Sequence, residues 1–186
     1  MSAKTTVSAH KLPGYGPTMR TAKRLTDQAV RIVGRAVPGR MPDVEVTLTT
    51  ERGMAELSAA ADLALADSTD RRAQRRAVDE GKRLARTSMA RAIPCPDGSV
   101  LVLVIADKHR TEAGFAVTVV HELVHAMQFS RKGVIDRVVR DTRDRLGIER
   151  QSRRDARAHQ FLLEQEEREA RGCHYLAHQI VPAAAA

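Results

Sequence analysis

The sequence predicts an α+β domain that is mainly helical and has a small sheet. Two short segments, Val44–Thr49 and Val100–Ile105, have the apolar and β-branched composition of strands. Most other segments place their apolar residues at helical spacing. A length of 186 residues suits a single domain. We assign residues 18–172 to this domain, residues 1–17 to an irregular N-terminal arm and residues 173–186 to a C-terminal tail.

The N-terminal half should form the arm, three helices and a strand. Prolines and glycines crowd residues 13–17 and favour irregular backbone. A helix is expected over 18–37, where apolar residues recur at helical spacing up to a Pro-Gly stop. The segment Val44–Thr49 alternates apolar and polar residues, which is typical of a strand with one buried face. Two further helices are expected over 53–66 and 70–92, separated by a polar break.

The C-terminal half should begin with a buried strand and continue as three helices. The continuous apolar segment Val100–Ile105 has the length of a strand and follows a Pro- and Gly-rich turn. A threonine cap predicts a helix over Glu112–Arg131, which a glycine stop then ends. Two more helices are expected over 134–146 and 148–172, and the tail Ala183–Ala186 should fray.

The expected helix over 112–131 contains the sequence His121-Glu122-Leu123-Val124-His125. Four residues on an α-helix advance about 400°, so the two imidazoles lie about 40° apart on one face and can share a cation. Glu122 projects about 100° away, where its carboxylate can reach a metal-bound water without being forced to ligate. Two neutral imidazoles one turn apart suit Zn²⁺. The pattern predicts a zinc site with His121 and His125 as metal ligands.

At these residues the chain resembles the zincin metallopeptidases, in which both histidines bind zinc and the glutamate between them is the general base. The similarity is clearest from about Leu101 to Phe129. It implies a zincin-like domain with an active-site helix carrying His-Glu-x-x-His. The Gly and His that metzincins carry after the motif are absent, since Gln128 and Arg131 stand there. The chain is therefore nearest the gluzincin and aspzincin branches, and among them the small intracellular ImmA/IrrE-type peptidases.

The resemblance implies a third zinc ligand on a helix downstream of the motif. ImmA/IrrE-type peptidases supply a glutamate shortly before a sequence with small residues and Phe, and the corresponding stretch here is Asp155–Phe161. Asp155 is therefore the favoured third ligand, because aspartate fills this role in a related zincin branch. Glu149 and His159 are alternatives. Asp155 also stands three residues after Ser152, a capping pattern that could serve only to start the helix.

Three residues are candidates for stabilising the oxyanion of a peptidase transition state. Several zincins use a Tyr or His for that hydrogen bond, so the resemblance implies Tyr175, His174 or His159. His159 stands one turn after Asp155 and could instead hold the ligand carboxylate in place. With His159 as the ligand, the set of three histidines would be closer to SprT-like proteases, which act on DNA-bound proteins.

The charge pattern bears on the choice of partner. Lys and Arg exceed Asp and Glu by 31 to 23, which gives a formal net charge of +8. The basic residues are interleaved with acidic ones and there is no Trp for base stacking. Nucleic acid is therefore a less favoured partner than a peptide or protein substrate. No oligomeric state is indicated.

The absence of long apolar stretches predicts a cytoplasmic protein. No segment is apolar enough for a membrane span or a signal peptide, so no membrane contact is expected. The two cysteines, Cys95 and Cys173, are far apart in the sequence and suggest neither a disulfide framework nor a zinc ribbon.

These features together predict a zinc-dependent metallopeptidase. Zinc held by His121, His125 and Asp155 would activate a bound water, and Glu122 would take its proton as general base. The strand Val100–Ile105 resembles the zincin strand that borders the cleft and pairs with an extended substrate. The alternatives are an SprT-like protease acting on DNA-bound proteins, and a non-catalytic, zinc-stabilised regulatory or nucleic-acid-binding module.

Overall fold

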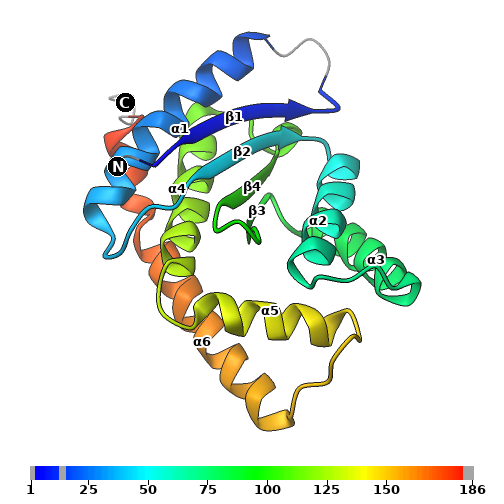
Figure 1. Ribbon diagram of the computed structural model, residues 1–186. Helices are drawn as coiled ribbons and strands as arrows, with labels where there is room; N and C mark the ends of the chain where they lie inside the picture. The colour runs from blue at the N-terminus through cyan, green and yellow to red at the C-terminus, as the bar shows by residue number, and fades with distance from the viewer. Residues whose placement is uncertain (1–2, 13–15, 182–186) are drawn as a thin grey trace.

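The computed structural model describes residues 3–12 and 16–181 and confirms the predicted α+β class (Figure 1). This part of the chain forms six α-helices, two short 3-10 helices and a four-stranded mixed sheet. The strands are β1 (Thr5–His10), β2 (Val44–Thr49), β3 (Ala90–Pro94) and β4 (Val100–Ile105). The helices are α1 (Gly16–Ala36), α2 (Glu51–Leu65), α3 (Arg71–Thr87), η1 (Ala106–Lys108), α4 (Glu112–Phe129), α5 (Val134–Arg145), α6 (Arg153–Gly172) and η2 (His174–Gln179).

Helices cover both faces of the sheet. The strand order is β1-β2-β4-β3, with β1, β2 and β4 parallel and β3 antiparallel to β4. Because side chains alternate along a strand, Val102 and Val104 join α1 and α4 in one core, whereas Leu103 and Ile105 join α2 and α3 in another. The domain therefore has three layers, with α1 and α4 on one side of the sheet and α2 and α3 on the other (Figure 1).

Helix α4 is the most deeply buried helix of the domain. Ten of its side chains are buried, and it packs against α1, β3, η2 and α6. The side chain of Thr111 accepts a hydrogen bond from the Gly114 amide at 3.0 Å, which confirms the predicted cap. The helix ends at Phe129, close to the predicted end. The segment carrying the two motif histidines is thus fixed on several sides by the core.

Helix α3 packs unusually closely on α2. Its buried residues are all small: Ala73, Ala77, Gly81 and Ala85. A Cβ on Gly81 would collide with the backbone carbonyl of Ala55 in α2, so the two backbones are almost in contact. Most of the long side chains of α3 are exposed on its outer side.

The structure corrects two expectations about secondary structure. The N-terminal arm, expected to be irregular, contains β1, which pairs in parallel with β2. The predicted helix over 70–92 ends at Thr87, and its last residues belong to β3. Both missed strands lie at the edges of the sheet, and their sequences carry little apolar alternation. The predictions for Pro13–Tyr15 and Ala183–Ala186 lie outside the described residues.

The role expected for the strand Val100–Ile105 also changes. This strand, β4, lies between β2 and β3 and is hydrogen-bonded on both sides. It therefore has no free edge to offer to an extended peptide. The edge strand next to α4 is β3, which has one neighbour among the described strands.

Two further expectations concern the membrane and the cysteines. Among the described residues, none of the helices combines the length and apolar character needed to cross a membrane. Cys95 and Cys173 are both free thiols, as their separation in the sequence indicated.

The close approach of α3 to α2 yields a stability prediction. Gly81→Ala should lower the free energy of unfolding by about 1–3 kcal/mol, because the added methyl group has to displace the Ala55 backbone. Gly34→Ala is the matched control, since nothing lies within 4 Å of its Cβ position in α1. That change should be neutral or stabilising by up to about 1 kcal/mol. Urea unfolding followed by circular dichroism measures both, and equal effects would contradict the packing described.

Candidate metal centre

The two motif histidines lie one turn apart on α4 and point the same ring atom toward one site. The Nε2 atoms of His121 and His125 are 3.1 Å apart. Their side chains are 18% and 13% exposed, so both rings are held at the edge of the core and still reach its surface. The predicted geometry of the motif is therefore present.

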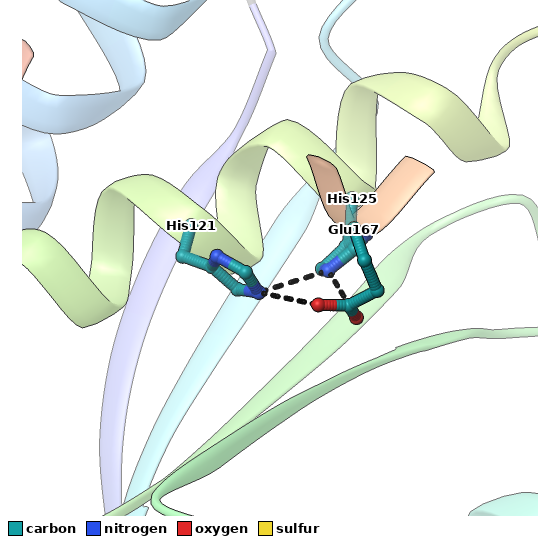
Figure 2. A group of neighbouring side chains, drawn as sticks. All are labelled: His121, His125 and Glu167. Atoms are coloured by element: carbon teal, nitrogen blue, oxygen red, sulfur yellow. Dashed lines mark hydrogen bonds and ion pairs between the residues drawn. The ribbon is translucent and has the colours of Figure 1, made fainter. Parts of the chain in front are cut away.

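A glutamate from the C-terminal helix completes the group. One carboxylate oxygen of Glu167 lies 3.2 Å from Nε2 of His125, and the other lies 3.6 Å from Nε2 of His121. Figure 2 shows the three side chains converging from α4 and α6. Within residues 3–12 and 16–181, these are the His, Cys, Asp and Glu side chains whose ligand atoms gather closely enough to hold an ion.

The three separations fit the coordination geometry of zinc. Atoms about 2.0–2.1 Å from a tetrahedral zinc lie about 3.3 Å from one another. The two nitrogens are 3.1 Å apart, and the nearest carboxylate oxygens lie 3.2 Å from one nitrogen and 3.6 Å from the other, which is close to this value. Two imidazole nitrogens and one carboxylate oxygen are also a donor set that zinc favours, and they leave a fourth position open.

The second nitrogen of His125 is held by Gln128. Nδ1 of His125 lies 2.8 Å from the side-chain oxygen of Gln128. The amide nitrogen of Gln128 donates to the Glu166 carbonyl and to the Glu169 carboxylate, each at 3.0 Å. Because the amide nitrogen is used in this way, the oxygen is the acceptor and Nδ1 of His125 carries the proton. This tautomer leaves the lone pair of Nε2 directed at the site.

The second nitrogen of His121 is held by another histidine. Nδ1 of His121 lies 3.0 Å from Nε2 of His174, which is in η2. A hydrogen bond from Nδ1 of His121 to His174 likewise leaves Nε2 of His121 free to ligate. Both ligand rings are thus oriented by partners from outside the motif.

Glu122 lies against the sheet and does not belong to the group of three ligand atoms. It is 7% exposed, and it accepts a hydrogen bond from the backbone of Ala92 in β3. Burial raises the pKa of its carboxyl to about 7, against the opposing effect of His125. A carboxyl with a pKa in this range can both accept and return a proton near neutral pH.

The pKa values of the other groups follow from burial and mutual contact. Burial lowers the pKa of His121 to about 4, with a further contribution from the nearby His125. A neutral imidazole is the form that binds metal. For His125, burial is outweighed by the contacts with Glu167, Glu122 and Gln128, so its pKa is raised. The contact with His125 lowers the pKa of Glu167, which therefore stays ionised.

The structure does not bring the favoured third ligand to the histidines, and Glu167 takes that place. Asp155 lies in the first turn of α6, where it is exposed and bound to Ser152, the capping residue of the helix. Glu167 is on the same helix about 18 Å further along the axis. Because α6 reaches α4 only with its C-terminal half, its first turn is remote from the site.

The two alternative ligands are also engaged elsewhere. Glu149 is exposed and forms an ion pair with Arg143 at 2.9 Å. His159 lies between α5 and α6, with Nδ1 3.0 Å from Arg137 and Nε2 3.4 Å from Asp141. Neither belongs to the candidate metal-ligand group, which consists of His121, His125 and Glu167.

Of the three candidates for oxyanion stabilisation, His174 is the one in contact with the candidate metal-ligand group. It touches His121 through its own ring nitrogen. Tyr175 is 60% exposed on η2. His159 is occupied by the contacts with α5 described above.

The signal for Glu167 in the sequence is weak. The segment from Glu164 to Glu169 holds four glutamates, and nothing in their spacing distinguishes one from the next. In the structure, Glu166 binds Arg137, Glu169 binds Arg131, and Glu167 alone turns toward the histidines. A search for arginine partners on the facing helices would have left Glu164 and Glu167 as the two unassigned acids.

Comparisons of the chain with protein-family models, with curated proteins and with solved structures found no match. Function therefore has to be inferred from the residues and geometry of this chain.

The ligand set makes a direct prediction for metal binding. Glu167→Gln should weaken zinc binding by at least about 100-fold, since loss of an outer partner alone costs 10- to 100-fold. Asp155→Asn is the matched control and should leave the affinity unchanged, because Asp155 is at the far end of α6. Competition with a chromogenic chelator measures both affinities. The reverse order of effects would assign the third ligand to Asp155.

The orientation of His125 by Gln128 can be tested in the same assay. Gln128→Ala should weaken zinc binding by about 10- to 100-fold, because the ring loses the acceptor that fixes its tautomer. Gln160→Ala is the control, since that amide bonds only to Glu164 on the exposed side of α6. If Gln128→Ala binds zinc as tightly as the wild type, the hydrogen bond from His125 to Gln128 is not needed to orient the ring.

Proposed function

We propose that this protein is a zinc-dependent peptidase whose metal ligands are His121, His125 and Glu167. The observation that carries the proposal is the convergence of the three side chains: the two Nε2 atoms are 3.1 Å apart, and each has a Glu167 oxygen within 3.6 Å. Two residues come from a helix pattern that resembles zincins, and the third is a glutamate from a later helix, as in the gluzincin branch. The ligand set thus supports that resemblance independently of the motif.

Zinc bound at these residues would supply a Lewis acid that activates water and polarises the scissile carbonyl. The chain holds the ion with three protein ligands, and this leaves a coordination position open to solvent or substrate. A purely structural zinc site would use four protein ligands. The described residues provide three, which favours a catalytic site.

Glu122 is the general base in this proposal. Its side chain lies next to His125 but is not one of the three candidate ligands. A general base has to be free of the metal in this way so that it can take a proton from the attacking water. Burial holds the pKa of Glu122 near 7, so the carboxylate can accept that proton and pass it to the leaving amine.

The edge strand β3 is the element best placed to hold an extended substrate. It packs against α4, and Ala92 of β3 contacts Glu122 directly. Backbone groups on a free strand edge can pair with the main chain of a peptide whatever its side chains. We therefore assign to β3 the substrate-pairing role that the sequence suggested for β4.

Replacement of the base should separate metal binding from turnover. Glu122→Gln should retain zinc and lose peptidase activity by about 10²-fold or more, because only the proton acceptor is removed. Cleavage of casein or of a fluorogenic peptide library, together with zinc content, measures both properties.

Glu112→Gln is the matched control for that experiment. It removes a carboxylate from the same helix at an exposed position paired with Arg24, three turns from the base. Its activity should equal that of the wild type. If the wild type binds zinc and cleaves no peptide bond, the alternative of a non-catalytic zinc-stabilised module holds.

A further inference from the structure

A set of exposed arginines lies outside the candidate metal centre, and none of them forms an ion pair with an acidic residue that the structure describes. Four are in the first two turns of α3, and three are at the start of α6 and just before it. None of them forms an ion pair within the described part of the chain, which contains 17 such pairs in total. We call this set the arginine surface, and its members are Arg71, Arg72, Arg75, Arg76, Arg150, Arg153 and Arg154.

The fold brings the first turns of α3, which hold four of the arginines, to the beginning of the connection that leads to the other three. Ala73 and Ala77 of α3 pack in one apolar cluster with Leu146, which ends α5, and with Ile148 beside it. The guanidinium of Arg76 occupies the space into which a Cβ on Gly147 would project. The start of α3 therefore lies against the α5–α6 connection, although some 70 residues separate them (Figure 1).

The acidic residues of these segments are already used by the fold. Asp70 caps α3 by accepting from the Ala73 amide at 2.8 Å. Asp144 accepts from the Gln151 amide, and Glu149 binds Arg143. Asp155 is bound to Ser152. These carboxylates keep their negative charge, but none of them pairs with an arginine of the set. Residues 70–76 and 149–155 hold seven arginines against three acidic residues, so these segments keep a net positive charge.

The arginine surface is also rigid at its base. The face of α3 opposite the arginines is made of small residues seated directly on α2, so the helix has little freedom to move. A fixed row of charged side chains on such a helix loses less entropy on binding than the same charges on a loop. The four arginines at the start of α3 are therefore presented on a firmly seated helix.

We propose that the arginine surface binds the phosphate backbone of a nucleic acid without reading its sequence. All seven residues are arginine, whose planar fork of donors matches phosphate oxygens. The two segments, 71–76 and 150–154, contain no exposed large apolar residue that could enter a lipid bilayer. They also contain no aromatic residue for base stacking, so the contacts are to the backbone and not to the bases. This inference does not depend on the proposed peptidase activity.

The experiment is a salt titration of binding by the full-length chain. Fluorescence anisotropy with a 20-base-pair duplex gives the affinity between 50 and 200 mM salt. With about five phosphate contacts, the slope of log affinity against log salt should be about −4.5. Vesicles with phosphatidylserine and a single strand of the same length are tested beside the duplex.

Matched variants locate the contact. Arg72→Gln, Arg75→Gln and Arg153→Gln together should weaken duplex binding on the order of 100-fold near 100 mM salt and flatten the slope by about three. The control combines Arg20→Gln, Arg31→Gln and Arg35→Gln, three exposed residues of α1 on the other side of the sheet. It removes the same charge and should change the affinity by less than about threefold, because charges at that distance are screened.

Three results would overturn the proposal. The first is an absence of nucleic-acid binding by the wild type at 50 mM salt. The second is an equal loss in both variants, which would mean that net charge alone attracts the polymer. The third is binding to the vesicles but to neither nucleic acid, which would assign the surface to a membrane. Unfolding curves of both variants should match the wild type, so that a loss of binding is not a loss of folding. A variant that keeps the charge, with Arg72→Lys, Arg75→Lys and Arg153→Lys together, should keep most of the binding.

Discussion

Helix α4 is buried on most sides, so the polar groups that it carries have to find partners inside the protein. Glu122 and Gln128 are almost inaccessible to solvent, and His121 and His125 are largely covered. A buried polar group without a partner costs about 1–3 kcal/mol, and the domain could not bear several such losses. The fold meets this requirement by bringing β3, η2 and α6 to the polar side of α4. The candidate metal centre is the place where those three elements meet.

The C-terminal helix serves this centre through three glutamates with different tasks. Glu166 and Glu169 bind Arg137 and Arg131, and with Gln128 they fasten α6 to α4 and α5. Glu167 lies between them in the sequence, about 100° from Glu166 and about 160° from Glu169 around the helix, so it faces the histidines. The two neighbours thus set the position of α6, and the position of α6 sets the ligand. The position of the Glu167 carboxylate beside the histidines therefore depends on the packing of α6.

The sequence is informative where a signal is local. The bounds of β2 and β4, the cap at Thr111 and the geometry of the two motif histidines all follow from spacing and composition. The third ligand does not, because its choice depends on which turn of α6 reaches α4, and that is decided by ion pairs between distant helices. The edge strands β1 and β3 escape prediction for a similar reason, since their pairing with the sheet comes from tertiary context. The function of the centre is an inference from this geometry and remains a proposal.

The most direct test of the account is a crystal structure of the zinc-loaded protein with anomalous diffraction at the zinc edge. We predict one zinc ion about 2.0–2.2 Å from Nε2 of His121, Nε2 of His125 and a carboxylate oxygen of Glu167, with a fourth position not taken by the protein. An anomalous peak coordinated by Asp155, Glu149 or His159, or the absence of any peak at His121 and His125, would contradict it.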